Sequence, residues 1–267
     1  PAPMTTSLPF TDAGSGRCGG TATAGWAEAM AASNMLRRFT TSNTSSAKFR
    51  KLSCTDATSS SRDMAAIYRR DSYHRYEYVY PIRPERAIPN ALLGLYERRR
   101  WWAQFKMNGT CSQIFVSPDG RLIAKGRHNN DHKQWSFTSA SGKLFSDLPG
   151  RGWYVFTAEL LHSKTTQIKD VNYLHDVLVA DGEVLTDLPY AERYGRLRQV
   201  MMRYAQSDTE SHYVLNRHTW LAKIFTHGFD DLFKTLQDDH EEGLVLKNPQ
   251  SPTSMVKTRR NHKNYSF

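Results

Sequence analysis

Lysines and carboxylates stand at the ends of apolar segments in this 267-residue sequence. Lys106 ends one such segment and leads into a tight turn, Met107-Asn108-Gly109. Glu159 interrupts an apolar run, and Glu242 and Lys247 bracket the apolar core of another. A carboxylate placed where the pattern demands core needs a cation or a metal ion beside it. Such a set suits phosphoryl transfer, because cations neutralise phosphates, carboxylates hold Mg²⁺ and one lysine can attack phosphorus.

The elements that must position these residues follow from the apolar patterning. Alternation and turn residues predict strands, and apolar spacing of three to four residues predicts helices. We predict strands over 76–80, 101–106, 111–117, 121–125, 153–161, 171–179 and 243–247, and helices over 91–97, 190–206 and 216–238. Hairpins come first and helices later, without a repeating strand–helix–strand rhythm, which favours an α+β fold over a doubly wound sheet.

The order of the polar motifs resembles the covalent nucleotidyltransferase superfamily, which comprises ATP-dependent DNA and RNA ligases and mRNA capping enzymes. The matching segments are Lys106-Met107-Asn108-Gly109, Arg127, Thr157-Ala158-Glu159, Tyr173-Leu174-His175-Asp176-Val177, Glu242–Lys247 and Lys257-Thr258-Arg259. The resemblance implies a catalytic domain over 74–263, in which two antiparallel sheets form an ATP cleft flanked by helices. We expect no OB-fold domain, because few residues follow the last motif.

The resemblance also implies a three-step reaction. Lys106 attacks the α-phosphate of ATP to form lysyl-AMP, AMP passes to a 5′-phosphate strand end, and a 3′-hydroxyl displaces it. Lys247 and Lys257 act with Lys106 in catalysis, and Glu159 and Glu242 hold Mg²⁺ or Mn²⁺. Gln104 reads the purine edge. The residues expected to bind the nucleotide are Gln104, Lys106, Asn108, Gly109, Arg127, Glu159, Tyr173, His175, Lys247, Lys257 and Arg259.

Departures from the family pattern bear on the substrate. His175 stands where the family stacks a Phe or Tyr on the purine, so Tyr173 is a second candidate for that role. Thr157-Ala158 replaces Asp-Gly, and Thr110-Cys111 stands where most DNA ligases and capping enzymes carry an Arg. These features favour an RNA ligase-like polynucleotide ligase, with a DNA ligase as the alternative. A capping guanylyltransferase and a non-catalytic nucleic-acid-binding relative are further alternatives.

The charge of the chain agrees with a polyanionic partner. Lys and Arg number 36 against 26 Asp and Glu, a formal net charge of +10, and nucleic acid is the usual partner of such a surplus. The basic side chains expected to face it are Arg98, Arg99, Arg100, Arg193, Arg196, Arg198, Arg203, Arg259, Arg260 and Lys263. No apolar run approaches the ~20 residues of a membrane span. We expect a monomer.

Two features of the sequence indicate in which cellular compartment the protein is expected. Three widely spaced cysteines form neither a disulfide framework nor a zinc ribbon, which indicates a reducing, intracellular compartment. Residues 1–62 are rich in Ser and Thr and poor in acids, without a sustained apolar pattern. This segment is therefore expected to be a disordered tail or a mitochondrial or plastid targeting peptide.

Overall fold

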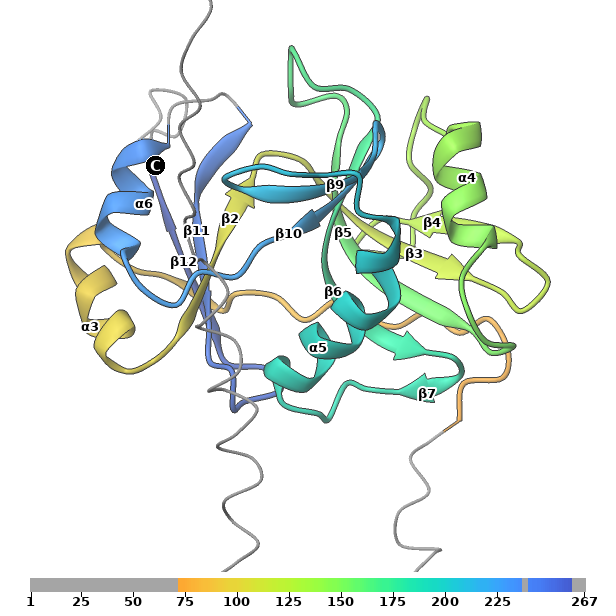
Figure 1. Ribbon diagram of the computed structural model, residues 1–267, viewed down its shortest axis with the longest axis horizontal. Helices are drawn as coiled ribbons and strands as arrows, with labels where there is room; N and C mark the ends of the chain where they lie inside the picture. Colours follow the sequence, from red (N-terminus) through yellow and green to blue (C-terminus); the bar gives the residue numbers. More distant parts are fainter. Residues whose placement is uncertain (1–71, 237–239, 261–267) are drawn as a thin grey trace, which may run out of the picture. The chain divides into compact units, whose positions relative to one another are not determined.

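The computed structural model describes residues 72–236 and 240–260 (Figure 1). The segment 1–62 and Lys263 lie outside the described residues. The described chain folds into two sheets with helices on their outer faces, so the predicted α+β class and the two-sheet architecture are confirmed. Both sheets are mixed rather than purely antiparallel, because each contains one parallel pairing, β10 with β6 and β1 with β12.

The larger sheet has eight strands in the order β4-β3-β5-β6-β10-β9-β8, with β7 paired to β6. Its strands are β3 (Thr110–Val116), β4 (Leu122–Lys125), β5 (Tyr154–Leu161), β6 (Val171–Ala180), β7 (Glu183–Val184), β8 (Ser207–Asp208), β9 (His212–Asn216) and β10 (Thr219–Ala222). The smaller sheet has the order β1-β12-β11-β2. Its strands are β1 (Arg86–Ala87), β2 (Trp102–Met107), β11 (Glu241–Lys247) and β12 (Met255–Arg259).

Helices cover one face of each sheet. The helical elements are η2 (Asn90–Leu92), α3 (Leu93–Arg98), α4 (Ser139–Ser146), α5 (Tyr190–Met201), η3 (Met202–Tyr204) and α6 (Phe229–Thr235). In Figure 1, α3 and α6 lie beside the smaller sheet, and α4 and α5 lie beside the larger one. Ala103 and Phe105 of β2 pack into a core with Phe229 of α6, whereas Phe156 of β5 packs into a second core with Leu197 of α5. Each buried Phe or Leu side chain stabilises the fold by roughly 1.5–3 kcal/mol relative to an exposed one.

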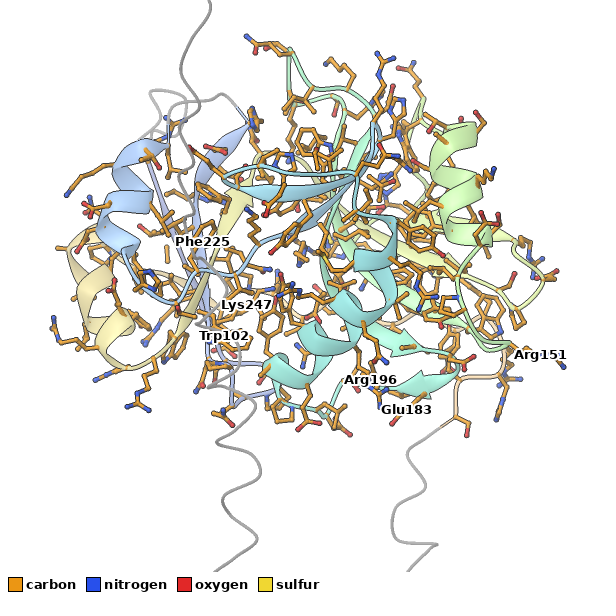
Figure 2. All side chains as sticks on the ribbon, in the orientation of Figure 1. Trp102, Arg151, Glu183, Arg196, Phe225 and Lys247 are labelled. Carbon is orange, nitrogen blue, oxygen red and sulfur yellow. The ribbon has the colours of Figure 1, made fainter. Side chains whose placement is uncertain are left out.

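Backbone pairing joins the two sheets near β2. Phe225, which follows β10 of the larger sheet, exchanges two backbone hydrogen bonds of 2.8 and 2.9 Å with Ala103 of β2. Figure 2 labels Phe225 in this region. The turn at Asn108 and Gly109 then carries the chain from β2 of the smaller sheet directly into β3 of the larger one. These connections hold the inner faces of the two sheets opposite each other.

Two predicted elements are wrong. Residues 76–80 form no strand: the rings of Tyr76 and Tyr78 pack against Phe115, and the Tyr78 hydroxyl donates to the carbonyl oxygen of Gly126 at 3.0 Å. The predicted helix over 216–238 is instead the β9–β10 hairpin followed by the short helix α6. Pairing of β10 with β6 and β9 outweighs the helical spacing of the apolar residues there, because strand formation depends on the neighbouring strands.

Candidate active site

A cleft of about 520 Å³ lies between the two sheets. Strands β2, β11 and β12 form one wall, and β3, β5 and β6 form the other. The predicted site residues that line it are Gln104, Lys106, Gly109, Arg127, Glu159, Tyr173, His175, Glu242, Lys247, Lys257 and Arg259. Asn108 does not line the cleft; its backbone N–H donates to the carbonyl oxygen of His240 at 2.7 Å. The structure therefore brings together all the predicted side chains but one.

Strand alternation explains why these residues meet. Successive side chains of a strand point to opposite faces, so residues two apart share a face. On β2, Gln104 and Lys106 line the cleft, whereas Ala103 and Phe105 belong to the core, and Phe105 also borders the cleft. On β12, Lys257 and Arg259 share the cleft face in the same way.

Lys106 and Arg259 both contact the carboxylate of Glu242. Nζ of Lys106 donates a hydrogen bond to Oε1 of Glu242, whose Oε2 lies 3.3 Å from Nε of Arg259. Glu242 takes this place through a β-bulge, since Glu241 pairs with Met107 and Gly243 already pairs with Lys106. A bulge re-aims a side chain that regular pairing would direct elsewhere. The carboxylate thus lies between two cations at the junction of β2, β11 and β12.

Two glycines of the motifs lie so close to a neighbouring strand that a Cβ atom would not fit. A Cβ atom on Gly109 would lie 2.6 Å from both Cγ of Glu159 and the carbonyl oxygen of Leu160. A Cβ atom on Gly243 would lie only 1.9 Å from the carbonyl oxygen of Thr258. Gly109 lets the turn after Lys106 pack directly on β5, and Gly243 lets β11 approach β12. Both contacts bring charged side chains to the cleft.

Glu159 projects into the cleft from β5 and is half-buried. Desolvation raises the pKa of its carboxyl group, and the nearby Lys106 and Lys164 offset part of that rise. Next to it, burial raises the pKa of the Cys111 thiol to about 11, so this cysteine stays protonated at neutral pH and is a poor nucleophile.

Lys247 is buried in the cleft wall, with 3% of its surface exposed. Its Nζ donates to the carbonyl oxygen of His175 at 3.2 Å and lies 4.0 Å from the centre of the Tyr190 ring. Figure 2 shows Lys247 close to Trp102, its partner in the β11–β2 pairing. Burial lowers the pKa of Lys247 to about 7, with Asp176 opposing the shift.

The purine-binding candidates are polar groups in apolar surroundings. Desolvation and the Lys247 charge lower the pKa of His175 to about 3, so its imidazole is neutral at pH 7. Gln104 and Tyr173 are each 2% exposed. Among the described residues, neither the Gln104 amide nitrogen nor the Tyr173 hydroxyl has a hydrogen-bond partner. A buried polar group without a partner costs about 1–3 kcal/mol, which a ligand would recover by bonding to it.

Two cleft residues were missed by the sequence analysis. Lys164 lies in the β5–β6 hairpin, lines the cleft and donates to the carbonyl oxygen of Gly109. Arg83 lines the cleft from the segment before β1. Neither residue belongs to an alternating pattern, although Lys164 follows directly on the strand that carries Glu159. With these two, seven basic and two acidic side chains line the cleft, so its net charge favours an anion.

Two carboxylates in the cleft fit a cation that arrives with phosphates. Glu159 and Glu242 line the same cleft, and no group of three or more His, Cys, Asp or Glu side chains suited to a metal occurs among the described residues. Mg²⁺ is usually bound by one or two carboxylates together with substrate phosphates, rather than by a cage of protein ligands. The donor set therefore suits Mg²⁺ bound with a nucleotide.

The predicted basic face needs one correction. Arg193 is fully buried and pairs with Asp176 through Nη2–Oδ2 at 2.9 Å and Nε–Oδ1 at 3.0 Å, so it cannot face a polyanion. Its charge satisfies a buried carboxylate instead. The three arginines 98–100, and also Arg196 and Arg203, are exposed. No helix in the described part of the chain is long and apolar enough to cross a membrane.

One known protein family matches the second half of the chain. A family model described as the ATP dependent DNA ligase domain matches residues 156–262. This region runs from β5 to β12 and includes Glu159, His175, Glu242, Lys247 and Lys257, whereas Lys106 lies before it. No curated protein sequence matches the chain.

Solved structures resemble the fold at low identity. A mycobacterial DNA ligase D complexed with ATP and MES is 15% identical and matches 69% of this chain and 62% of its own, with a TM-score of 0.50. The ligase domain of LigD from M. tuberculosis is 16% identical over 69% and 61% of the two chains (TM-score 0.47). The ATP-dependent DNA ligase of bacteriophage T7 in complex with ATP is 11% identical over 65% and 64% (TM-score 0.41). The chain thus spans about three fifths of the length of the mycobacterial structures that it matches.

Proposed function

We propose that this chain belongs to the covalent nucleotidyltransferase superfamily and is the catalytic domain of an ATP-dependent polynucleotide ligase. The observation that carries this proposal is the position of Lys106. Its amine lies in a cleft with a strong excess of basic side chains and contacts Glu242, one of the two carboxylates that the described residues place along that cleft. A nucleophile among phosphate-binding cations is the arrangement that nucleotidyl transfer to lysine requires.

In the first step, Nζ of Lys106 attacks the α-phosphorus of ATP. A P–N bond forms, the bond to the bridging oxygen breaks, and pyrophosphate leaves as the lysine loses a proton. Lys257 and Arg259 lie on the same face of β12 and neutralise the α-phosphate. Charge that develops on the phosphate oxygens is stabilised most where such cations are already in place.

Lysyl-AMP then supplies AMP to a nucleic acid. An oxygen of the 5′-phosphate strand end attacks the same phosphorus, and the P–N bond to Lys106 breaks. A 3′-hydroxyl next attacks the 5′-phosphate, loses its proton, and releases AMP as the strands join. Glu159 and Glu242 would hold Mg²⁺, which neutralises phosphate charge when bound.

The base is bound where Gln104, Tyr173 and His175 line the cleft. The neutral imidazole of His175 offers a flat apolar face, and Tyr173 lies two residues earlier on the same strand. The amide nitrogen of Gln104 donates to a purine acceptor, which satisfies the hydrogen bond that this buried group lacks among the described residues. Together these three residues support recognition of adenine.

DNA is the first candidate substrate, because the family model that matches residues 156–262 is that of the ATP dependent DNA ligase domain. RNA is the second candidate. Thr110 after the motif glycine and Thr157-Ala158 in place of Asp-Gly favour it, as the sequence analysis expected.

Sealing of nicked duplexes tests this proposal. Substrates would differ in whether the 3′-hydroxyl strand and the 5′-phosphate strand are DNA or RNA, with ATP and Mg²⁺ present. We expect sealed or 5′-adenylated DNA from the natural protein and none from Lys106→Ala. Lys234→Ala is the matched control, because Lys234 is exposed on α6 and pairs with Asp231 at the surface. Reaction of RNA alone would favour the second candidate, and reaction of neither would contradict the proposal.

A further inference from the structure

The amine of Lys247 lies inside the protein without a carboxylate beside it. Among the described residues no Asp or Glu lies within salt-bridge distance of its Nζ, and its one hydrogen bond goes to the carbonyl oxygen of His175. An ammonium group has three donors and is costly to bury unless it is paired. The charged form of Lys247 therefore depends on another group.

That group is the ring of Tyr190. Its centre lies 4.0 Å from Nζ of Lys247, well inside the ~6 Å within which an aromatic face attracts a cation. The Tyr190 hydroxyl donates to the carbonyl oxygen of His175 at 2.9 Å, the same oxygen that accepts from Lys247. One side chain thus contacts the ammonium through its ring and fixes the ammonium's other partner through its hydroxyl.

Tyr190 is itself held by a buried ion pair one helical turn further along α5. Arg193 lies 5.5 Å from the Tyr190 ring and binds Asp176 through two hydrogen bonds. Its Nη1 also donates to the carbonyl oxygens of Leu188 at 2.7 Å and Pro252 at 2.9 Å. Because Pro252 lies between β11 and β12, this arginine connects α5 to both sheets.

We propose that Tyr190 is a positioning residue that holds the Lys247 ammonium at the cleft wall without neutralising it. A carboxylate at this position would cancel the charge, whereas an aromatic face and a carbonyl stabilise it and leave it able to attract phosphate. The Asp176–Arg193 pair fixes the helix that carries Tyr190. This inference rests on the proposed function, since it assumes that Lys247 meets a phosphate of the nucleotide.

The test compares substitutions at position 190 by the pH dependence of the KM for ATP in lysyl-AMP formation, measured from pH 6 to pH 9. Tyr190→Phe keeps the ring, so we expect a KM within about twofold of the natural value. Tyr190→Met fills the space without an aromatic face, and we expect KM at pH 7 to rise on the order of tenfold. Loss of the ring disfavours the ammonium form of Lys247. The affinity for ATP should therefore begin to fall at a lower pH in this variant than in the natural protein.

The groups that face Lys247 and enter this pH dependence are few. They are His175 and Asp176 on β6 and Tyr190 and Arg193 on α5. His175 is already neutral across the range measured. Because ATP and Lys257 are common to every variant, a difference in the profile between Tyr190→Met and the natural protein reports on Lys247.

Tyr194→Met is the matched control. Tyr194 lies one turn further along α5, is also buried and donates its own hydroxyl hydrogen bond to the carbonyl oxygen of Ala222 at 2.6 Å. Its ring centre lies 6.0 Å from that of Tyr190, but it makes no contact with Lys247 among those the structure records for the described residues. We expect this variant to lose stability but to keep the natural KM and its pH profile. An equal shift in KM for both variants would overturn the inference.

A double-mutant cycle separates positioning from general packing. If Tyr190 acts through Lys247, Tyr190→Met should have no further effect on KM in a Lys247→Met background, whereas independent effects would multiply. Should Tyr190→Met fail to fold, fluorinated phenylalanines at position 190 weaken the ring's negative face with little change in size. KM should then rise with each fluorine, and a flat series would overturn the inference. A natural protein that forms no lysyl-AMP would instead overturn the proposed function.

Discussion

At the scale of single residues, each charge in the cleft is held differently, and this decides what it can do. Lys106 contacts a carboxylate, so its position depends on Glu242. Lys257 is partly exposed, and desolvation together with the neighbouring Arg259 lowers its pKa. Lys247 is buried against an aromatic ring, and burial lowers its pKa to about 7, within the physiological range.

Nucleotide binding should therefore be coupled to proton uptake. Lys247 has a pKa of about 7 without ligand, so at pH 8 most molecules carry it as the neutral amine. A bound phosphate favours the ammonium and raises that pKa, so binding at pH 8 should take up protons, and binding at pH 6 should take up fewer. Titration calorimetry with α,β-methylene ATP, in buffers that differ in ionisation enthalpy, measures the number of protons taken up on binding.

The lysine can be identified by substitution. Lys247→Met should abolish the extra uptake at pH 8, and Lys234→Met should leave it intact because Lys234 lies outside the cleft. Equal uptake in the natural protein and Lys247→Met would contradict the assignment.

The order of the motifs predicted most of the polar residues that line the cleft, and strand alternation explains why they meet. Residues two apart on one strand share a face, so alternation alone groups Gln104 with Lys106 and Lys257 with Arg259. The burial of Arg193 could not be predicted, since it depends on Asp176, a residue 17 positions away. Lys164 was missed because a hairpin loop has no periodicity.

At the scale of elements, the junction of β11 with β12 should depend on Gly243. A Cβ atom there would lie 1.9 Å from a backbone oxygen that cannot move without displacing β12. We expect Gly243→Ala to destabilise the protein by about 1–3 kcal/mol or more, as overpacking does. Chemical denaturation measures the change in the free energy of unfolding.

Gly195→Ala is the control for this substitution. Gly195 lies in the middle of α5, and no described atom lies within 4 Å of the Cβ that would be added. Alanine in a helix interior should stabilise the protein by about 0.5–1 kcal/mol relative to glycine. Changes of opposite sign in the free energy of unfolding for the two substitutions would support the packing argument. No change in that free energy for Gly243→Ala would contradict it.

The long strands β5 and β6 were predictable because each is a mostly apolar run that is buried on both faces. The elements that sequence patterns failed to predict are those that tertiary contacts decide. Helix α4 is short and is capped by Thr138, whose side-chain oxygen accepts from the backbone N–H of Ser141 at 3.3 Å. The β9–β10 hairpin carries apolar residues at helical spacing but pairs with β6. Its conformation depends on β6, where Asn172 pairs with Thr219 of β10.

At the scale of the whole described molecule, contacts between the sheets define the cleft. Phe225 pairs with Ala103, and the start of α5 is tied to the β11–β12 loop through hydrogen bonds of 3.1 and 3.0 Å to the carbonyl oxygens of Ser251 and Pro249. These contacts place seven basic side chains around one space. The net charge of +10 predicted a polyanion, and the fold concentrates part of that charge where a triphosphate would bind.

The central claim is that Lys106 becomes covalently linked to AMP. The most direct measurement is mass spectrometry of the protein after incubation with Mg²⁺ and either ATP or GTP, followed by digestion at neutral pH to preserve the acid-labile bond. We predict one AMP per molecule, on the peptide that contains Lys106, and no adduct with GTP. AMP on another lysine, an adduct with GTP alone, or no adduct with either nucleotide would contradict the account.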